Sequence, residues 1–174
     1  MLKSFEKRIF CLRELSIGWL LVAKSHRGIC HIALGDTAQQ LLQEFTGHFS
    51  DIQQDADDNV FHQEVVHIVA MVETPHLVRH YDLPLDIRGT AFQQRVWAAL
   101  CEVQCGETIS YTELAQHIGM PKAVRAVANA CARNELALAI PCHRVLCKNG
   151  AVSGYRWGIQ RKQIVLQREQ RKCF

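Results

Sequence analysis

Apolar residues in the first part of the chain form two short runs typical of β-strands. Residues 17–24 and 29–34 are rich in Val, Ile, Leu and aromatic side chains. The residues between them, Ser25-His26-Arg27-Gly28, are polar and end in glycine, which suits a tight turn between antiparallel strands. The pattern therefore predicts a β-hairpin near the amino terminus.

A different spacing follows the hairpin. Residues 60–73 place apolar side chains three and four positions apart, which is the period of a helix with one buried face. A shorter helix is expected over residues 37–47, and the acidic segment 51–59 between the two helices predicts a loop. Composition changes near residues 80–87, where we expect the boundary between a first domain (1–85) and a second (86–174).

Helix start signals are prominent after this boundary. Thr90-x-x-Gln93 has the form of a capping box and predicts a helix to about residue 103, ended by Gly106. Ser110-x-x-Glu113 has the same form and predicts a second helix over residues 111–118. The second half is therefore expected to be mostly helical, which makes the whole chain an α+β protein.

A third helix is expected from Pro121, at a first helical position, to about Arg133. Gly119-Met120 would join it to the preceding helix in a helix-turn-helix outline. Its inward face is predicted to hold Val124, Val127, Ala128 and Cys131. Its other face combines positive and small residues, which suits the backbone and groove of a nucleic acid: Lys122, Arg125, Ala126, Asn129, Ala132 and Arg133.

Charge differs between the two halves of the chain. Residues 1–85 carry seven Lys and Arg against eleven Asp and Glu, a net −4, whereas residues 86–174 carry thirteen against six, a net +7. A basic half next to an acidic one is consistent with a polyanion-binding surface on the second half.

Overall composition is that of a globular protein, with 48% hydrophobic and 21% charged residues. No uncharged apolar run approaches the 18 residues of a membrane span. The first eight residues carry charges where a signal peptide needs an apolar stretch, so we expect a cytoplasmic protein without a membrane partner.

The chain has eight cysteines, which could indicate disulfides or a metal site. A reducing cytoplasm disfavours disulfides. Structural zinc sites favour C-x2-C pairs, whereas the closest spacings here are Cys101-x3-Cys105, on the predicted helix, and Cys142-x4-Cys147. We therefore expect no metal ion.

The segment Ile140-Pro141-Cys142-His143-Arg144-Val145 carries the candidate chemistry. A thiol becomes a strong nucleophile when a nearby base removes its proton, and His143 is such a base. Pro141 restricts the backbone before the cysteine. The alternative is that Cys142 is only a small buried apolar residue, as free cysteines often are.

A nucleophilic cysteine a few residues beyond a DNA-binding helix suggests a reaction on DNA. The target base would have to leave the stack, Arg125 is long enough to fill the gap, and Tyr111 offers a hydroxyl beside the base. A thiolate is suited to attack on an sp3 carbon. Alkyl transfer is therefore favoured over hydrolysis, which would also need an oxyanion site.

The motif around Cys142 resembles the signature of the O6-alkylguanine-DNA alkyltransferases. Further segments resemble the same family in order: 83–94, Gly106–Tyr111, Pro121–Val127, Asn134 and Gly154-Tyr155-Arg156-Trp157-Gly158. The first and last of these are closest to the carboxy-terminal half of the bacterial adaptive-response members of the family. The resemblance is strong over residues 83–169 and looser before them.

The resemblance implies a fold and an activity. The fold would be a small RNase H-like α/β domain followed by a mostly helical domain with a winged helix-turn-helix. The activity would be that of a methylated-DNA–[protein]-cysteine S-methyltransferase, a monomer without a cofactor that acts on double-stranded DNA containing O6-alkylguanine. It would flip the base through the minor groove. Acceptance of thymine O4 and of bulky alkyl groups is left open.

The resemblance also implies residue roles. Cys142 would accept the alkyl group, His143 would act as base through a water, and Glu169 would polarise the imidazole. Asn134 would tie the helix-turn-helix to the active-site turn, and Tyr111 would assist the departing guanine. The residues expected to contact DNA are Tyr111, Thr112, Lys122, Arg125 and Ala126. Those expected to line the guanine pocket are Val145, Tyr155 and Arg156.

Two other functions fit parts of the pattern. A DNA-binding regulator with a structural cysteine would keep its function in a Cys142→Ala variant, whereas a cysteine hydrolase would turn over many times on an ester or amide. The non-catalytic relatives of the family lack the cysteine, and the presence of Cys142 argues against that class. A thioether product resists hydrolysis, so each molecule is expected to act once.

Overall fold

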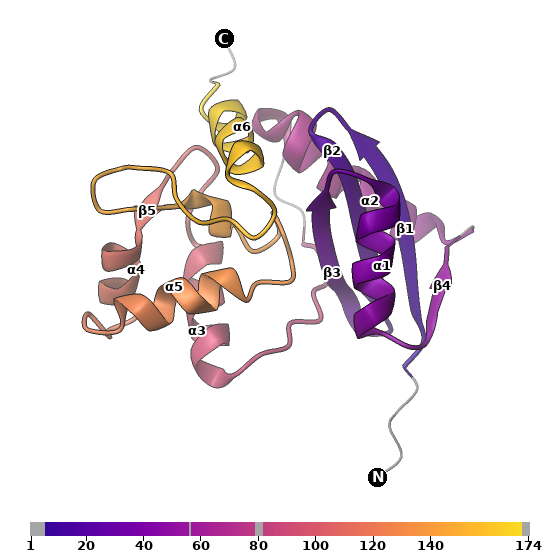
Figure 1. Cartoon of the computed structure of the whole chain (residues 1–174), viewed down its shortest axis with the longest axis horizontal. Coiled ribbons are helices and arrows are strands. Elements are labelled where there is room, and N and C mark those ends of the chain that lie inside the picture. Colours follow the sequence, from indigo (N-terminus) through magenta and orange to yellow (C-terminus); the bar gives the residue numbers. More distant parts are fainter. Residues whose placement is uncertain (1–5, 56, 79–81, 172–174) are drawn as a thin grey trace.

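The computed structural model describes residues 6–55, 57–78 and 82–171. Its first half is built on a four-stranded sheet in the order β3-β2-β1-β4 (Figure 1). β1 pairs antiparallel with β2, β2 antiparallel with β3, and β4 parallel with β1. The strands are β1 (Arg8–Leu15), β2 (Gly18–Ser25), β3 (Gly28–Gly35) and β4 (Ile52–Gln54).

The predicted hairpin is confirmed as β2 and β3, but two strands were missed. β1 gave no clear signal because its buried positions do not alternate: Phe10 and Cys11 are neighbours and both are buried. β4 lies inside the segment 51–59, where the prediction of a loop was wrong for residues 52–54. Those three residues are Ile, Gln and Gln, so the strand depends on pairing with β1 and not on its own hydrophobic pattern.

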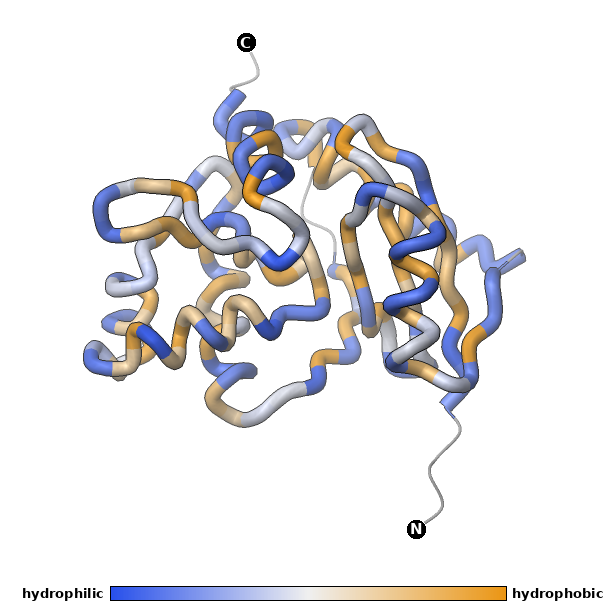
Figure 2. The backbone as a smooth tube through the Cα atoms, in the orientation of Figure 1, coloured by the Kyte–Doolittle hydropathy of each residue, from blue (hydrophilic) through white to orange (hydrophobic). Residues whose placement is uncertain are grey.

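Helices α1 (Ala38–His48) and α2 (Asn59–Glu73) follow the predicted ranges closely. α1 packs against β2 and β3, and α2 packs against β1. Figure 1 shows α1 crossing in front of the sheet, and Figure 2 shows apolar residues along the strands that it covers. All eight residues of β3 are buried. A short 3-10 helix, η1 (Pro75–Leu77), ends this half.

The second half is mostly helical, as predicted. Thr90 and Ser110 both form complete capping boxes, which begin α3 (Ala91–Cys101) and α4 (Tyr111–His117). α5 (Val124–Ala132) and α6 (Ile159–Glu169) complete the helices of this half. Two short strands, β5 (Ile109–Ser110) and β6 (Val145–Leu146), pair in parallel beside the 3-10 helix η2 (Cys142–Arg144).

Two predicted helix boundaries were wrong. α3 ends at Cys101 and not near residue 103, so Cys105 is not on this helix, and Gly106 lies in the following turn with φ +85°. α5 begins at Val124 and not at Pro121. Its start has no side-chain cap, so neither the proline nor a capping residue marks the boundary.

Strand β3 joins the two halves through its outer edge. Ile29 donates its N–H to Pro84 O (2.7 Å) and accepts from Asp86 N (2.8 Å). Further along, Ile32 donates to Glu135 O (2.9 Å) and accepts from Ala137 N (3.1 Å). The edge of the sheet is thereby satisfied by two segments of the second half, one of which leads into the region of Cys142.

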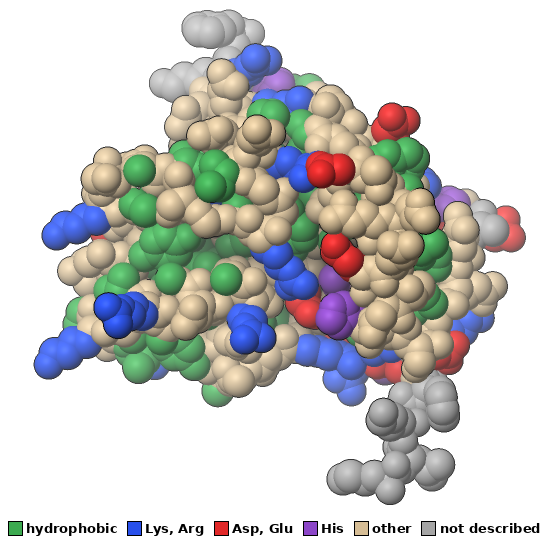
Figure 3. Space-filling model, viewed as in Figure 1, with side chains coloured by type: hydrophobic (Ala, Val, Ile, Leu, Met, Phe, Trp, Pro, Cys, Tyr) green, Lys and Arg blue, Asp and Glu red, His purple; other side chains and the backbone are tan. Residues whose placement is uncertain are grey.

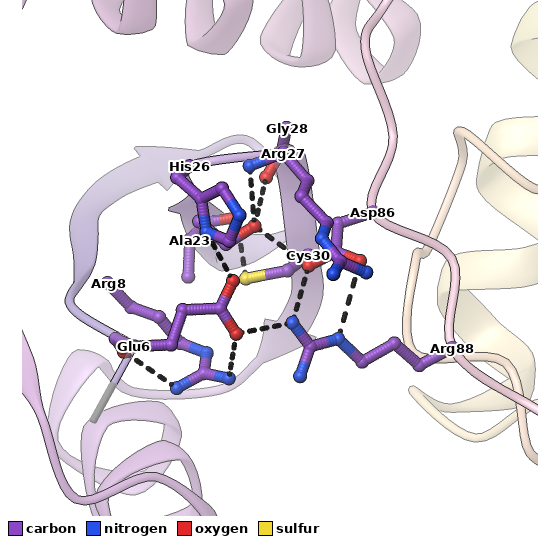
Figure 4. A network of polar contacts seen from close by, with 10 residues as sticks. Glu6, Arg8, Ala23, His26, Arg27, Gly28, Cys30, Asp86 and Arg88 are labelled. Atoms are coloured by element: carbon purple, nitrogen blue, oxygen red, sulfur yellow. Dashed lines mark hydrogen bonds and ion pairs between the residues drawn. The ribbon is translucent and has the colours of Figure 1, made fainter. Parts of the chain in front are cut away.

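A polar network holds the first of these segments in place (Figure 4). Asp86 accepts from Ser25 Oγ (2.8 Å) and from Arg88 Nη2 (2.8 Å). Arg88 and Arg8 both pair with Glu6, whose other oxygen lies 2.7 Å from His26 Nδ1. The expected domain boundary at residues 85 and 86 falls inside this network and stays a prediction.

The fold is a mixed α/β arrangement, and one continuous hydrophobic core runs through both halves. Trp97 of α3 donates its indole N–H to Ala130 O (2.9 Å), which fixes α5 against the core. Among the residues described, no helix has the length and apolar content that a membrane crossing requires. The core thus supports α5 and the turn around Cys142 from behind.

Candidate active site

Cys142 begins the 3-10 helix η2 and is 6% exposed. The chain reaches it through an unusual backbone turn, in which Leu138 has φ +70°, a left-handed conformation that costs roughly 1–2 kcal/mol for a side chain of this kind. Cys142 N then donates to Ile140 O (2.8 Å). The buried surroundings hold this turn in place and fix the direction of the sulfur.

Asn134 ties this turn to the end of α5. Its Nδ2 donates to Ile140 O (2.9 Å), to Leu136 O (3.3 Å) and to Cys142 Sγ (3.2 Å). Its Oδ1 accepts from Leu136 N (2.8 Å). The side chain is fully buried. One amide therefore connects the helix end, the turn and the sulfur, which is the position that the resemblance implied for this residue.

His143 points away from the sulfur-bearing pocket and meets Glu169 at the end of α6. The His143 Nε2–Glu169 Oε1 distance is 2.8 Å, and both side chains are buried. Arg144 also contacts this carboxylate, with Nη2 2.8 Å from Oε1 and Nε 3.1 Å from Oε2. Nδ1 of His143 is buried and has no hydrogen-bond partner in the described part of the chain.

Burial and hydrogen bonding set the charges in this cluster. Burial would raise the pKa of Glu169, but hydrogen bonds from His143 and Arg144 lower that pKa to about 2. Burial lowers the pKa of His143, although the hydrogen bond to Glu169 opposes this effect. An ionised Glu169 only accepts, so the proton of neutral His143 is on Nε2 and its Nδ1 is a free base.

The thiol itself is not acidic at rest. Burial raises the pKa of Cys142, while the Asn134 amide and the Lys162 ammonium lower it. A thiolate at this position would therefore have to be formed by transfer of the proton to a base.

Lys162 is a site residue that the sequence did not indicate. It lies on α6, is fully buried, and its Nζ donates to Val145 O (2.6 Å), Ser153 O (2.9 Å) and Gly154 O (3.3 Å). Lysines on an amphipathic helix are normally exposed, so its residue type gave no reason to expect a buried lysine at this position. A signal was present: Lys162 is seven residues before Glu169 and three before the buried Val165, which places all three close to one face.

A cavity of about 450 Å³ opens in front of the sulfur. Tyr155 and Arg156 line it as predicted, and its remaining lining residues are Tyr111, Ala128, Asn129, Cys131, Ala132, Cys142, Ser153 and Gly154. The hydroxyl of Tyr155 is buried without a hydrogen-bond partner among the described residues. Val145 does not line this cavity, and its carbonyl is instead bonded to Lys162. The volume is that of a pocket for a small organic group.

The outer face of α5 lies next to this cavity. Arg125, Ala126 and Asn129 are exposed, Lys122 is exposed just before the helix, and Thr112 on α4 is half-buried. Figure 3 shows Lys and Arg side chains over the part of the molecule that holds α4 and α5, and Asp and Glu mainly over the first half. The inward face is Val127, Ala130 and Cys131; the expected Val124 and Ala128 are only half-buried.

Neighbouring residues complete the walls. Burial raises the pKa of Tyr111 to about 12, so its hydroxyl keeps its proton and can donate a hydrogen bond into the cavity. Arg156 donates to Asn134 O (3.1 Å), which links the cavity wall to the amide that holds the sulfur. No group of three or more His, Cys, Asp or Glu that could hold a metal ion occurs in the described ranges.

Comparison with known proteins gives consistent similarities. The family of the 6-O-methylguanine DNA methyltransferase DNA-binding domain matches residues 91–171. The regulatory protein ada of Salmonella typhimurium is 50% identical over 163 residues, 94% of this chain and 46% of that protein. The methylated-DNA–protein-cysteine methyltransferase of Debaryomyces hansenii is 35% identical over 87% of this chain and 85% of that protein.

Solved structures show the same similarity. The crystal structure of Mycobacterium tuberculosis OGT in complex with DNA superposes with a TM-score of 0.77 and 33% identity, over 93% of this chain and 92% of that one. The present chain spans less than half of the Salmonella protein and of the Escherichia coli bifunctional transcriptional activator/DNA repair enzyme Ada, at 46% and 45% of their lengths.

Proposed function

The chain belongs to the methylated-DNA–protein-cysteine methyltransferase family, and from this we propose that it repairs DNA by taking a methyl or other alkyl group from guanine O6 onto Cys142. The observation that carries the proposal is the placement of one sulfur between two features. A cavity large enough for a base lies in front of Cys142, and the His143–Glu169 pair lies behind it. The product is a thioether, so the transfer is irreversible and each molecule acts once.

The proton of the thiol passes through a water to Nδ1 of His143, the free base identified above. Glu169 is ionised and stabilises the imidazolium that forms. The sulfur then forms a bond to the alkyl carbon, and the bond from that carbon to guanine O6 breaks. Its electron pair leaves with the purine, which subsequently takes up a proton.

Two hydrogen-bond donors support the charges that develop. The Tyr111 hydroxyl donates to the departing guanine, since its raised pKa of about 12 keeps it protonated. Asn134 Nδ2 and the nearby Lys162 ammonium favour the thiolate. The half-buried ring of Tyr155, together with Arg156, encloses the base. Enclosure from water strengthens each of these interactions.

We propose double-stranded DNA as the partner, bound through α5 in the minor groove. The small exposed Ala126 would permit close approach of the helix, and Lys122 and Thr112 would contact the DNA beside it. Arg125 would occupy the gap left by the extrahelical base. α4 and α5 would act as a helix-turn-helix, and the turn at residues 147–151, closed by Cys147 N–Ala151 O (3.0 Å), as its wing.

We also propose that the first half is an RNase H-like domain. Three antiparallel strands with β4 parallel to β1 at the other edge support this description. Its backbone bonds to residues 135–137 support a scaffold role. The expected monomeric state and cytoplasmic location stay predictions.

Intact mass measurement tests the proposed function. After incubation with a duplex containing one O6-methylguanine, the protein should gain the mass of one methyl group in place of hydrogen, mapped to Cys142. Cys142→Ala should abolish this gain and still bind DNA. Cys131→Ala is the matched control, because Cys131 lines the same cavity but has no histidine next to it in the chain. Loss of the methyl group from DNA without any mass gain, or many repaired lesions per protein, would disprove the proposal.

A further inference from the structure

Helix α6 carries two pairs of charged residues, each pair seven positions apart. Arg161 and Arg168 form one pair, and Lys162 and Glu169 form the other. Seven residues make close to two helical turns, so each pair shares a face, and the two faces are about 100° apart. The helix therefore presents two distinct charged stripes to its surroundings.

The arginine pair contacts the amino-terminal half. Arg161 Nε donates to Ile17 O (2.9 Å), in the turn between β1 and β2. Arg168 Nη2 donates to Ser16 Oγ (2.7 Å) in the same turn, and its Nη1 donates to Val72 O (2.8 Å) in α2. Figure 1 shows α6 where these elements of the first half meet the second.

Glu73 completes this set of contacts. Its Oε1 accepts from Ser16 N (2.7 Å) and its Oε2 from Ser16 Oγ (2.7 Å), while Arg168 Nη1 lies 3.2 Å from Oε2. Burial would raise the pKa of Glu73, but the bonds from Ser16 and Arg168 lower it. We name Ser16, Glu73 and Arg168 the arginine clamp.

The other pair, Lys162 and Glu169, contacts residues of the candidate active site. Lys162 holds the carbonyls of Val145, Ser153 and Gly154, and Glu169 contacts His143. Arg168 and Glu169 are consecutive, so a shift of the helix end that loosens one must move the other. The last turn of α6 therefore transmits the position of the first half to the carboxylate of Glu169.

We propose that the arginine clamp is a positioning device for the reaction: by fixing the end of α6 on the amino-terminal half, Arg168 aligns Glu169 with His143. This inference rests on the proposed role of His143 as the base. It gives the amino-terminal half a part in the chemistry, since two members of the clamp, Ser16 and Glu73, belong to that half. The three are positioning residues and touch no reacting atom.

The charges around His143 determine its pKa, which is the quantity that the test follows. Besides Glu169, the charged groups that act on His143 are Arg144 and Lys162, which lower its pKa, with burial the largest effect in the same direction. Cys105, Cys142 and Tyr155 are the further titratable groups around Glu169 and the sulfur. Because the Glu169 hydrogen bond raises the pKa of His143, a misaligned carboxylate should lower that pKa further.

The test compares Arg168→Met and Glu73→Gln with wild type in single-turnover methyl transfer from an O6-methylguanine duplex, between about pH 5 and 9. Arg168→Met should slow the transfer roughly tenfold or more, because small misalignments of catalytic groups are costly. The acidic midpoint of the rate should move to lower pH. Glu73→Gln should shift it in the same direction by less, and Arg168→Lys should restore part of the rate.

Arg171→Met is the matched control, since it removes the same charge from an exposed residue at the same helix end. It should leave rate and midpoint unchanged. Unchanged profiles in Arg168→Met and Glu73→Gln, even with lower melting temperatures, would overturn the proposal. If wild type transfers no methyl group, the proposed function is wrong. NMR titration of the His143 ring in the same variants then tests the arginine clamp separately. A His143 pKa that is the same in the variants and in wild type would reject the clamp.

Discussion

The sulfur of Cys142, which we propose to be the reactive one, differs from other buried sulfurs of the molecule by its neighbours and not by its burial. Burial raises the pKa of Cys11 and of Cys30 to about 11, and it raises that of Cys142 as well. What Cys142 has in addition is the Asn134 amide 3.2 Å from its sulfur and His143 as the next residue. Reactivity at this position therefore depends on a route for the proton, not on an acidic resting thiol.

His31 gives a pH-dependence at the level of one residue. It lies on β3 beside the rings of Phe45 and Phe49, and burial lowers its pKa to about 4, with a contribution from Arg156. A histidine whose folded pKa is depressed is neutral in the folded protein and gains a proton on unfolding. Stability should therefore fall as the pH drops from 6.5 towards 4, by at most about 3 kcal/mol from this residue.

Urea unfolding at several pH values measures this effect. A His31→Phe variant should lose part of the decline between pH 6.5 and 4, because it has no group to protonate in the unfolded state. His76→Phe, at an exposed position, is the control and should decline like wild type. Equal pH-dependence in wild type and His31→Phe would contradict the explanation.

At the level of elements, the sequence predicts the helices far better than the short strands. Thr90 and Ser110 start their helices because each side chain bonds a free N–H of the first turn, a local effect that a sequence displays directly. β4, β5 and β6 have three residues or fewer and exist through pairing with distant segments, Ile109 with Val145 for example. Such pairing leaves little local trace.

The candidate site shows the same difference between local signals, which the sequence displays, and contacts between distant segments, which it does not. Cys142 and His143 were singled out from their own motif, and Asn134 and Glu169 through the resemblance. The structure brings Asn134 into contact with Cys142, and Glu169 into contact with His143. Lys162 was missed because a buried lysine requires three carbonyls from two separate segments, and no pattern within α6 specifies them. Contacts such as these, between segments that only the tertiary structure brings together, could not be predicted from the sequence.

Helix α5 is the element through which we propose that DNA is bound. An Arg125→Ala variant should transfer methyl from duplex DNA roughly 10- to 100-fold more slowly, since holding a base outside the stack is worth a few kcal/mol. Transfer from a single-stranded oligonucleotide should change little, because no stack has to be opened. The measurement is the single-turnover transfer rate on each substrate, compared between Arg125→Ala and wild type.

Arg133→Ala is the control for charge alone, because Arg133 is an exposed arginine at the other end of α5. In either variant, loss of one phosphate contact weakens DNA binding. It also lowers by about one the slope of the logarithm of the binding constant against the logarithm of the salt concentration. An equal slowing of Arg125→Ala on both substrates would show that Arg125 acts through charge and not by filling the stack.

At the level of the whole molecule, alkylation changes a core residue. Cys142 is 6% exposed and packed in the continuous core. An added methyl group in such a site costs ~1–3 kcal/mol. We expect the methylated protein to melt several degrees below the free protein, at roughly 2–4 °C per kcal/mol for a chain of this size.

Differential scanning calorimetry before and after stoichiometric methylation measures this change. Cys142→Ala treated with the same DNA is the control and should keep its melting temperature. Equal melting temperatures of the methylated and free proteins would show that the cavity in front of the sulfur accommodates the methyl group without strain.

The outer edge of β3 has a consequence during synthesis on the ribosome. The first partner for that edge is Pro84 and the second is Glu135, about fifty and one hundred residues later in the chain. Until both have emerged, a nascent chain carries a largely apolar strand with unpaired backbone groups, which is a template for intermolecular pairing. Premature termination in this interval would therefore yield aggregation-prone fragments, so a chaperone that shields strand edges would be needed most between these two points.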